Sequence, residues 1–146
     1  MKRVVGSVLI VILMAAASTW LFGQRWLGER AFNAAIETRA GIDRTAELPD
    51  GLHVFVCGSG SPFPDENRAG PCLAVLAGRD GYIFDAGSGS MRKLGAMGFP
   101  MDRLDAAFLT HLHSDHLDGL GELMLQAWMA GRRAEPLPIY GPEGTD

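Results

Sequence analysis

The chain opens with a long apolar run that differs from the pattern of the rest. Residues 4–23 contain no charged side chain and follow Lys2 and Arg3. A helix of about 20 apolar residues crosses the hydrocarbon core of a bilayer, so residues 1–23 are predicted to form a signal anchor or transmembrane helix. Residues 24–39 mix apolar and charged positions at helical spacing, which predicts a juxtamembrane helix. A polar linker then completes the segment 24–51.

From residue 52 the pattern changes to short apolar runs separated by turn-forming residues. Strands are predicted at 54–57, 72–77, 82–85, 106–109 and 137–140. A helix is predicted at 90–97, and a second one follows residue 116. In the second, apolar residues recur at i, i+3, i+4, i+7 and i+8: Leu120, Leu123, Met124, Ala127 and Trp128. Alternating strands and helices predict an α/β layered domain over residues 52–146.

Two interpretations of the amino-terminal run stay open. The small residues 15–18 offer a cleavage site for a secretory signal, but residues 19–22 continue the apolar run and Trp20 suits a membrane interface. An uncleaved anchor is therefore favoured. Lys2 and Arg3 predict that the short amino terminus stays cytoplasmic. The domain would then be anchored to the inner membrane on its periplasmic side, or free in the periplasm if the signal is cleaved.

Composition and charge narrow the class of protein. The chain is 47% hydrophobic and 21% charged, with a net charge of -4 and no long run of Lys or Arg. It lacks the basic stripe expected of a nucleic-acid binder, so nucleic acid is not expected as a partner. Cys57 and Cys72 lie at ends of predicted strands, where they would either pair in an oxidising compartment or serve as small buried apolar residues.

Most of the histidines that could bind a metal ion follow the predicted strand 106–109. Residues 110–116 read Thr-His-Leu-His-Ser-Asp-His and contain three of the four histidines of the chain. In an extended segment alternate side chains point the same way, so His111 and His113 can converge on one ion. Asp115 and His116 follow where a helix begins and can hold a second ion. Imidazole with carboxylate favours zinc, although iron or manganese suits the same groups.

This stretch resembles the HxHxDH signature of the metallo-β-lactamase superfamily. Its flanks, residues 58–62, 67–71, 83–87 and 140–145, resemble the ribonuclease Z and arylsulfatase-like branch. The resemblance implies the N-terminal half of an αββα sandwich, here preceded by the membrane helix. It also implies two zinc ions, held in part by His111, His113, Asp115 and His116.

The resemblance implies further roles around the metals. Asp115 would take or relay a proton, and Asp85 would lie beneath the ions and orient their ligands; an Asp that caps the turn after a strand is the alternative. Gly60 and Arg68 would approach the substrate, with Arg68 contacting an anionic group. A plain turn and a solvated arginine are the alternatives. Phe63 replaces the third glycine of a dinucleotide-binding loop, which excludes that interpretation.

No histidine follows His116, and Asp118 and Glu122 are not spaced as bridging ligands. We therefore expect an incomplete ligand shell and the N-terminal part of a longer protein, with this polypeptide inactive alone. The resemblance implies that the complete protein is a dinuclear zinc hydrolase acting through a metal-bound hydroxide. Because the domain is expected to be exported, the expected substrate is a small anionic ester of phosphate or sulfate. The alternatives are a ribonuclease Z-like endonuclease that processes tRNA 3′ ends and a truncated, non-catalytic, membrane-anchored remnant.

Overall fold

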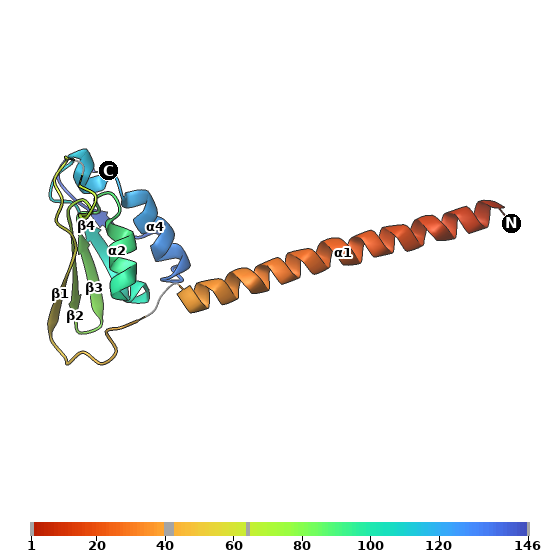
Figure 1. Cartoon of the computed structure of the whole chain (residues 1–146), viewed down its shortest axis with the longest axis horizontal. Coiled ribbons are helices and arrows are strands. Elements are labelled where there is room, and N and C mark those ends of the chain that lie inside the picture. Colours follow the sequence, from red (N-terminus) through yellow and green to blue (C-terminus); the bar gives the residue numbers. More distant parts are fainter. Residues whose placement is uncertain (1, 40–42, 64, 146) are drawn as a thin grey trace. The chain divides into compact units, whose positions relative to one another are not determined.

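The computed structural model describes residues 2–39, 43–63 and 65–145. The chain divides into two compact units, Met1–Thr38 and Arg39–Asp146. The first unit is formed by helix α1, Lys2–Arg39. The second contains a sheet with helices packed on it (Figure 1).

Helix α1 is continuous through both segments that the sequence pattern separates, because the change at residue 24 is one of polarity and not of helix propensity. Its part Ile10–Ala35 has the length and apolar composition of a membrane span, and none of it is buried. A signal sequence passes the same test, so membrane insertion stays a prediction. In the polar part, Arg25 pairs with Glu29 at 3.0 Å, and the guanidinium of Arg30 lies 4.2 Å from the centre of the Trp26 ring.

The second unit is built on a five-stranded sheet in the order β1-β2-β3-β4-β5. The strands are β1 Leu52–Gly58, β2 Cys72–Ala77, β3 Asp80–Phe84, β4 Leu104–Phe108 and β5 Ile139–Tyr140. The pairs β1·β2 and β2·β3 are antiparallel, whereas β3·β4 and β4·β5 are parallel. All five strands occur where the apolar runs predict them, with ends that differ by up to two residues.

The helices are α2 Ser90–Met97, α3 Ser114–Leu117 and α4 Leu120–Met129, with the 3-10 turn η1 Met101–Arg103 before β4. Figure 1 shows α2 and α4 on one face of the sheet. The single helix expected after residue 116 is divided into α3 and α4. The division lies at Gly119, whose N–H donates to Ala86 O at 2.7 Å, and a Cβ there would lie 2.7 Å from two backbone oxygens. This close approach ends α3.

The core lies between this face and the helices. Alternate residues of β2, together with Ile83 of β3, are buried against α2 and α4: Cys72, Ala74 and Leu76 from the strand, Met91, Leu94, Leu123 and Ala127 from the helices. Phe55 packs edge to face on Phe99, with ring centres 5.5 Å apart. Burial of these side chains stabilises the layer by about 25 cal/mol for each Å² of apolar surface removed from water.

The opposite face of the sheet is apolar and exposed. On β1, Leu52, Val54 and Val56 are 70, 57 and 55% exposed. Stacked rings continue the face across three strands, with centres 5.2 Å apart for Phe84–Phe108 and 5.3 Å for Phe108–Tyr140. An apolar sheet face normally packs against a second layer; the expected half of a sandwich stays a prediction.

A disulfide resolves the alternatives left open for the two cysteines. Cys57 and Cys72 are bonded, with Cα atoms 5.1 Å apart, and both are almost fully buried. The bond joins the end of β1 to the start of β2 and closes the loop 58–71. That loop carries Gly60 and Arg68.

Residues 43–51 pack on the domain instead of forming a free linker. Asp43 pairs with Arg103 at 3.0 Å, Arg44 N donates to Gly98 O at 3.0 Å, and Thr45 is buried. Burial would raise the pKa of Asp43, but the hydrogen bonds from Thr45 and the charge of Arg103 outweigh burial, so the pKa of Asp43 lies below its ordinary value of 3.8.

Asp43→Asn should therefore flatten the acid side of the stability profile. Because the folded pKa is depressed, the carboxylate stabilises the domain above about pH 4, and this contribution is lost as the pH falls through the folded pKa. Urea unfolding midpoints from pH 7 to pH 2.5 measure the effect, which should be about 1 kcal/mol or less at neutral pH. Asp105→Asn, at an exposed position on β4, is the control and should follow the parent profile. Equal slopes in all three proteins would contradict the prediction.

Candidate metal centre

The candidate site lies where β3 and β4 end. The two strands are parallel and their last pair is Phe84 with Phe108, so the residues that follow both strands meet at one edge of the sheet. Asp85 N donates to Phe108 O at 2.8 Å, and Thr110 N donates to Asp85 Oδ1 at 2.8 Å. The histidine stretch starts directly beyond this junction.

The predicted ligands lie together in pairs. His111 Nε2 is 3.1 Å from His113 Nδ1, and His116 Nε2 is 3.6 Å from Asp115 Oδ2. Two donors on one tetrahedral zinc, each about 2.0–2.1 Å from the ion, lie about 3.3 Å apart. The ring centres of His111 and His116 are 3.9 Å apart, which brings the two pairs side by side. Among residues 2–39, 43–63 and 65–145, however, no three His, Cys, Asp or Glu side chains form a group that could hold an ion.

The extended conformation expected for residues 111–113 accounts for the convergence of His111 and His113, because His113 still has extended backbone angles before α3 begins. One detail differs from expectation. Leu112 does not turn into the protein but is 40% exposed. Strand β4 ends at Phe108, so Leu112 lies beyond the sheet and its side chain is not held against the core.

Asp85 contacts the last histidine of this stretch, and its role in orienting metal ligands stays a prediction. It is 7% exposed, has a left-handed backbone with φ of 60°, and its Oδ2 lies 2.8 Å from His116 Nδ1. Asp tolerates the left-handed region better than most residues. Burial would raise the pKa of Asp85, but hydrogen bonds from Thr110 and His116 outweigh it and hold that pKa below its usual value. The alternative role of capping the turn does not account for the contact with His116.

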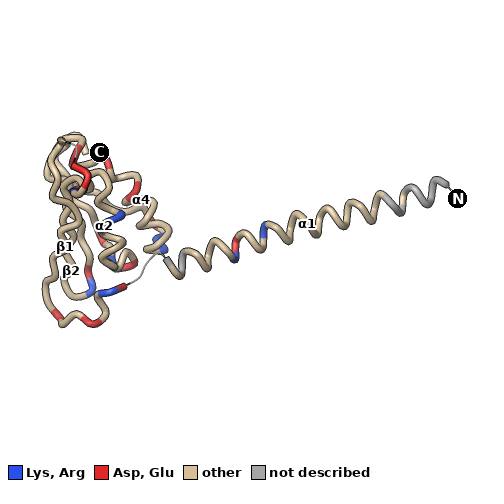
Figure 2. Tube along the Cα trace, in the orientation of Figure 1, with Lys and Arg blue, Asp and Glu red and all other residues tan. Residues whose placement is uncertain are grey.

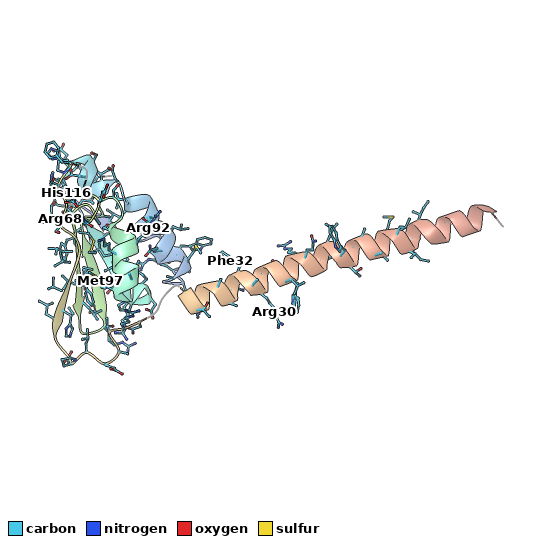
Figure 3. The ribbon with its side chains drawn as sticks, in the orientation of Figure 1. Arg30, Phe32, Arg68, Arg92, Met97 and His116 are labelled. Carbon is cyan, nitrogen blue, oxygen red and sulfur yellow. A yellow bond between two sulfur atoms is a disulfide. The ribbon has the colours of Figure 1, made fainter. Side chains whose placement is uncertain are left out.

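A cavity of about 410 Å³ adjoins the site. It is lined by residues of the loop 61–70, by Ser88 and Gly89, and by Asp115 and Asp118. Arg68 is one of these lining residues; its side chain is 63% exposed and lies 3.7 Å from Asp65. Figure 3 shows Arg68 and His116 at the same end of the domain. The contact of Arg68 with an anionic group stays a prediction.

Two residues considered in the sequence have other contacts. Gly60 does not line this cavity. Its N–H donates to Ala69 O at 2.7 Å, and a Cβ at Gly60 would lie 2.7 Å from the same oxygen, so this glycine lets the loop close on itself. Glu122 pairs with Arg92 at 3.2 Å and is separate from the histidine cluster.

Comparison with known proteins identifies the family. Residues 52–143 match the family described as anti-Pycsar protein Apyc1. The chain belongs to this family. Ribonuclease Z of Mycobacterium bovis is 43% identical over 96 residues, which cover 64% of this chain and 34% of the relative. Ribonuclease Z of Mycolicibacterium gilvum is 41% identical over the same shares.

Solved structures agree with this placement. The short form of human tRNase Z is 30% identical, with a TM-score of 0.56, over 62% of this chain and 35% of the other. The metallo-β-lactamase fold protein YhfI from Bacillus subtilis is 31% identical, with a TM-score of 0.56, over 66% of this chain and 39% of the other. The Apyc1-family domain is thus an α/β domain of the metallo-β-lactamase superfamily, in its ribonuclease Z branch. The chain spans about a third of the length of the curated relatives it matches.

Sequence reasoning missed a glycine contact that positions the site of the Apyc1-family domain. A Cβ at Gly87 would lie 2.4 Å from Asp115 O, and one at Gly70 would lie 3.0 Å from the same oxygen. The backbone of Asp115 therefore rests on two residues that have no side chain. The only sequence signal is Gly87 following Asp85 by two positions; nothing in the sequence shows that its neighbour is residue 115.

Proposed function

We propose that the protein is a divalent-metal-dependent phosphodiester hydrolase that acts on RNA. The observation that carries this proposal is the paired arrangement of His111 with His113 and of Asp115 with His116 at one strand end. The donor set fits zinc, because neutral imidazole and carboxylate are ligands that zinc prefers. Ions held there would act as Lewis acids on the ester and activate water.

Three residues of this chain are proposed to transfer a proton, orient a ligand and bind the substrate. Asp115 lines the cavity and lies beside His116, so it is proposed to take or relay a proton between water and the leaving group. Asp85 holds the His116 ring through Nδ1 and leaves Nε2 directed toward Asp115. Arg68 is proposed to bind a phosphate oxygen of the substrate.

RNA replaces the small ester as the favoured substrate. The relatives at 41 to 43% identity are named ribonuclease Z, and a solved relative is a tRNase Z. The net charge argued against nucleic acid, and Figure 2 shows Lys and Arg scattered among Asp and Glu across the described part of the domain. Net charge governs long-range attraction, whereas cleavage needs only local contacts. Arg68 is one such contact, and Lys93, whose Nζ donates to Asn67 O at 2.8 Å, adds a second cation to the same loop.

A second candidate is an exported hydrolase of small phosphate esters. Two observations favour it. The Cys57–Cys72 disulfide is typical of oxidising compartments, and α1 contains a segment long and apolar enough to span a membrane. A periplasmic enzyme would not meet tRNA precursors. Sulfate esters have no comparable support.

The test is a substrate comparison on the protein that carries this chain, purified with zinc and again after chelation. A labelled tRNA precursor, a generic aryl phosphodiester and an aryl sulfate are supplied in parallel. We expect cleavage of the precursor and of the diester, lost on chelation and restored by zinc. Cleavage of the small diester alone would favour the exported hydrolase, and failure to take up metal would favour the non-catalytic remnant. A topology reporter fused after Gly51 decides the side of the membrane.

A further inference from the structure

We infer that Thr110 is a positioning residue that sets the ring tautomer of His111, so that His111 and His116 both keep Nε2 free of hydrogen. The Thr110 hydroxyl lies between the carboxylate of Asp85 and the ring of the neighbouring His111, and His116 Nδ1 is a more distant contact at 3.5 Å. Thr110 Oγ1 is 2.8 Å from Asp85 Oδ2, 3.1 Å from Asp85 Oδ1 and 3.0 Å from His111 Nδ1. The use of this tautomer rests on the proposed metal site, but the tautomer itself does not.

Only one direction of the hydrogen bonds among Asp85, Thr110 and His111 supplies a hydrogen atom to each contact. A carboxylate can only accept, so the single hydrogen of the Thr110 hydroxyl must point to Asp85. If it pointed to His111 instead, two oxygens 2.8 Å apart would face each other with no hydrogen between them. The hydroxyl therefore accepts from His111, and His111 Nδ1 must carry the hydrogen.

The same carboxylate sets the second ring directly. His116 Nδ1 lies 2.8 Å from Asp85 Oδ2, so it must also carry a hydrogen. Asp85 thus controls two histidines, His116 by contact and His111 through the Thr110 hydroxyl. In each neutral ring the hydrogen at Nδ1 leaves Nε2 with a free lone pair.

A consequence follows for His113. His111 Nε2 has no hydrogen, and His113 Nδ1 lies 3.1 Å from it, so His113 Nδ1 must donate in the metal-free protein. His113 is therefore the ring whose hydrogen must leave Nδ1 when an ion takes the place of this hydrogen bond. His111 and His116 keep their tautomers.

The hydroxyl of Thr110 can be removed without breaking the backbone contact that holds this residue in place. Thr110 N donates independently to Asp85 Oδ1 at 2.8 Å, so a side-chain change leaves this tie intact. Thr110 is exposed, and Thr110→Val preserves its β-branched shape while it removes the hydroxyl. Thr110→Ser keeps the hydroxyl and is the matched control.

The experiment records long-range ¹H–¹⁵N spectra of the histidine rings in the full chain, first without metal and then with zinc. In the parent and in Thr110→Ser we expect the Nδ1–H tautomer at His111 and His116. In Thr110→Val we expect His111 to become a mixture of tautomers while His116 is unchanged. Zinc affinity should fall by about 10- to 100-fold in Thr110→Val and recover in Thr110→Ser.

An Nε2–H tautomer at His111 in the parent protein would overturn the inference without any variant, as would an unchanged His111 in a folded Thr110→Val. If the parent shows the expected tautomers yet binds no zinc, the proposed function fails and this inference stands.

Discussion

Replacement of His113 by alanine should remove metal binding and hydrolysis together from the protein that carries this chain. His113 supplies one of two paired donors, 3.1 Å from His111 Nε2, and loss of a direct ligand should exceed the about 10- to 100-fold reduction in affinity that follows loss of an outer partner. The ring is exposed, so the domain should remain folded. Zinc content after dialysis and the rate of phosphodiester cleavage measure the two effects.

His53→Ala is the matched control for this substitution. His53 lies on β1, outside the histidine cluster, and its Nε2 contacts Pro49 O at 2.8 Å. The control should retain zinc and turnover. A His113→Ala protein that keeps its metal and its rate, or a His53→Ala protein that loses both, would remove the basis for assigning the site to residues 111–116.

Removal of the disulfide should produce the largest loss of stability. The bond joins residues separated by 15 positions, and closure of a loop of this size stabilises a domain by about 3 kcal/mol through the unfolded chain. The double variant Cys57→Ala, Cys72→Ala should lose about this amount in urea unfolding. Both sulfur atoms are buried, so part of the loss will come from the removed apolar contacts.

Treatment with a reductant distinguishes the contribution of the disulfide bond to stability from that of the apolar contacts of the two cysteines. It should destabilise the parent domain and leave the double variant unaffected. An equal response of both proteins, or a parent midpoint that does not move although free thiols are detected, would show that the bond contributes little. Loss of the bond should also loosen the loop 58–71, which carries Arg68 beside the cavity.

The strands and helices of the domain could be predicted from the sequence because each depends on a local pattern of apolar and polar residues. The apolar run 72–77 and the helical stripe 90–97 match β2 and α2 in full. The strand expected at 137–140 is shortened to Ile139–Tyr140, since Pro138 has no N–H to donate to a ladder. The change of composition at residue 24 did not end α1, because polarity alone does not interrupt helical hydrogen bonds.

In the candidate site, too, some residues are visible from local sequence and others depend on distant neighbours. Residues 111, 113, 115 and 116 lie within six positions, so their ligand chemistry and spacing are visible in the chain itself. Asp85 was reachable only through a family resemblance, since its partner His116 is 31 residues away. Thr110 and Gly87 were given no role, because their roles depend on neighbours that no sequence pattern relates to them.

By itself the sequence determined the candidate donor residues, their order after a strand and the α/β class, since each depends on residue chemistry and on periods of two or 3.6 residues. Tertiary structure alone decided which groups meet. Parallel pairing of β3 with β4 brings Asp85 under Thr110 and His116, and bare glycine backbone lets residue 115 approach residues 70 and 87. Such contacts depend on register between distant segments, and register is settled only when the strands pair.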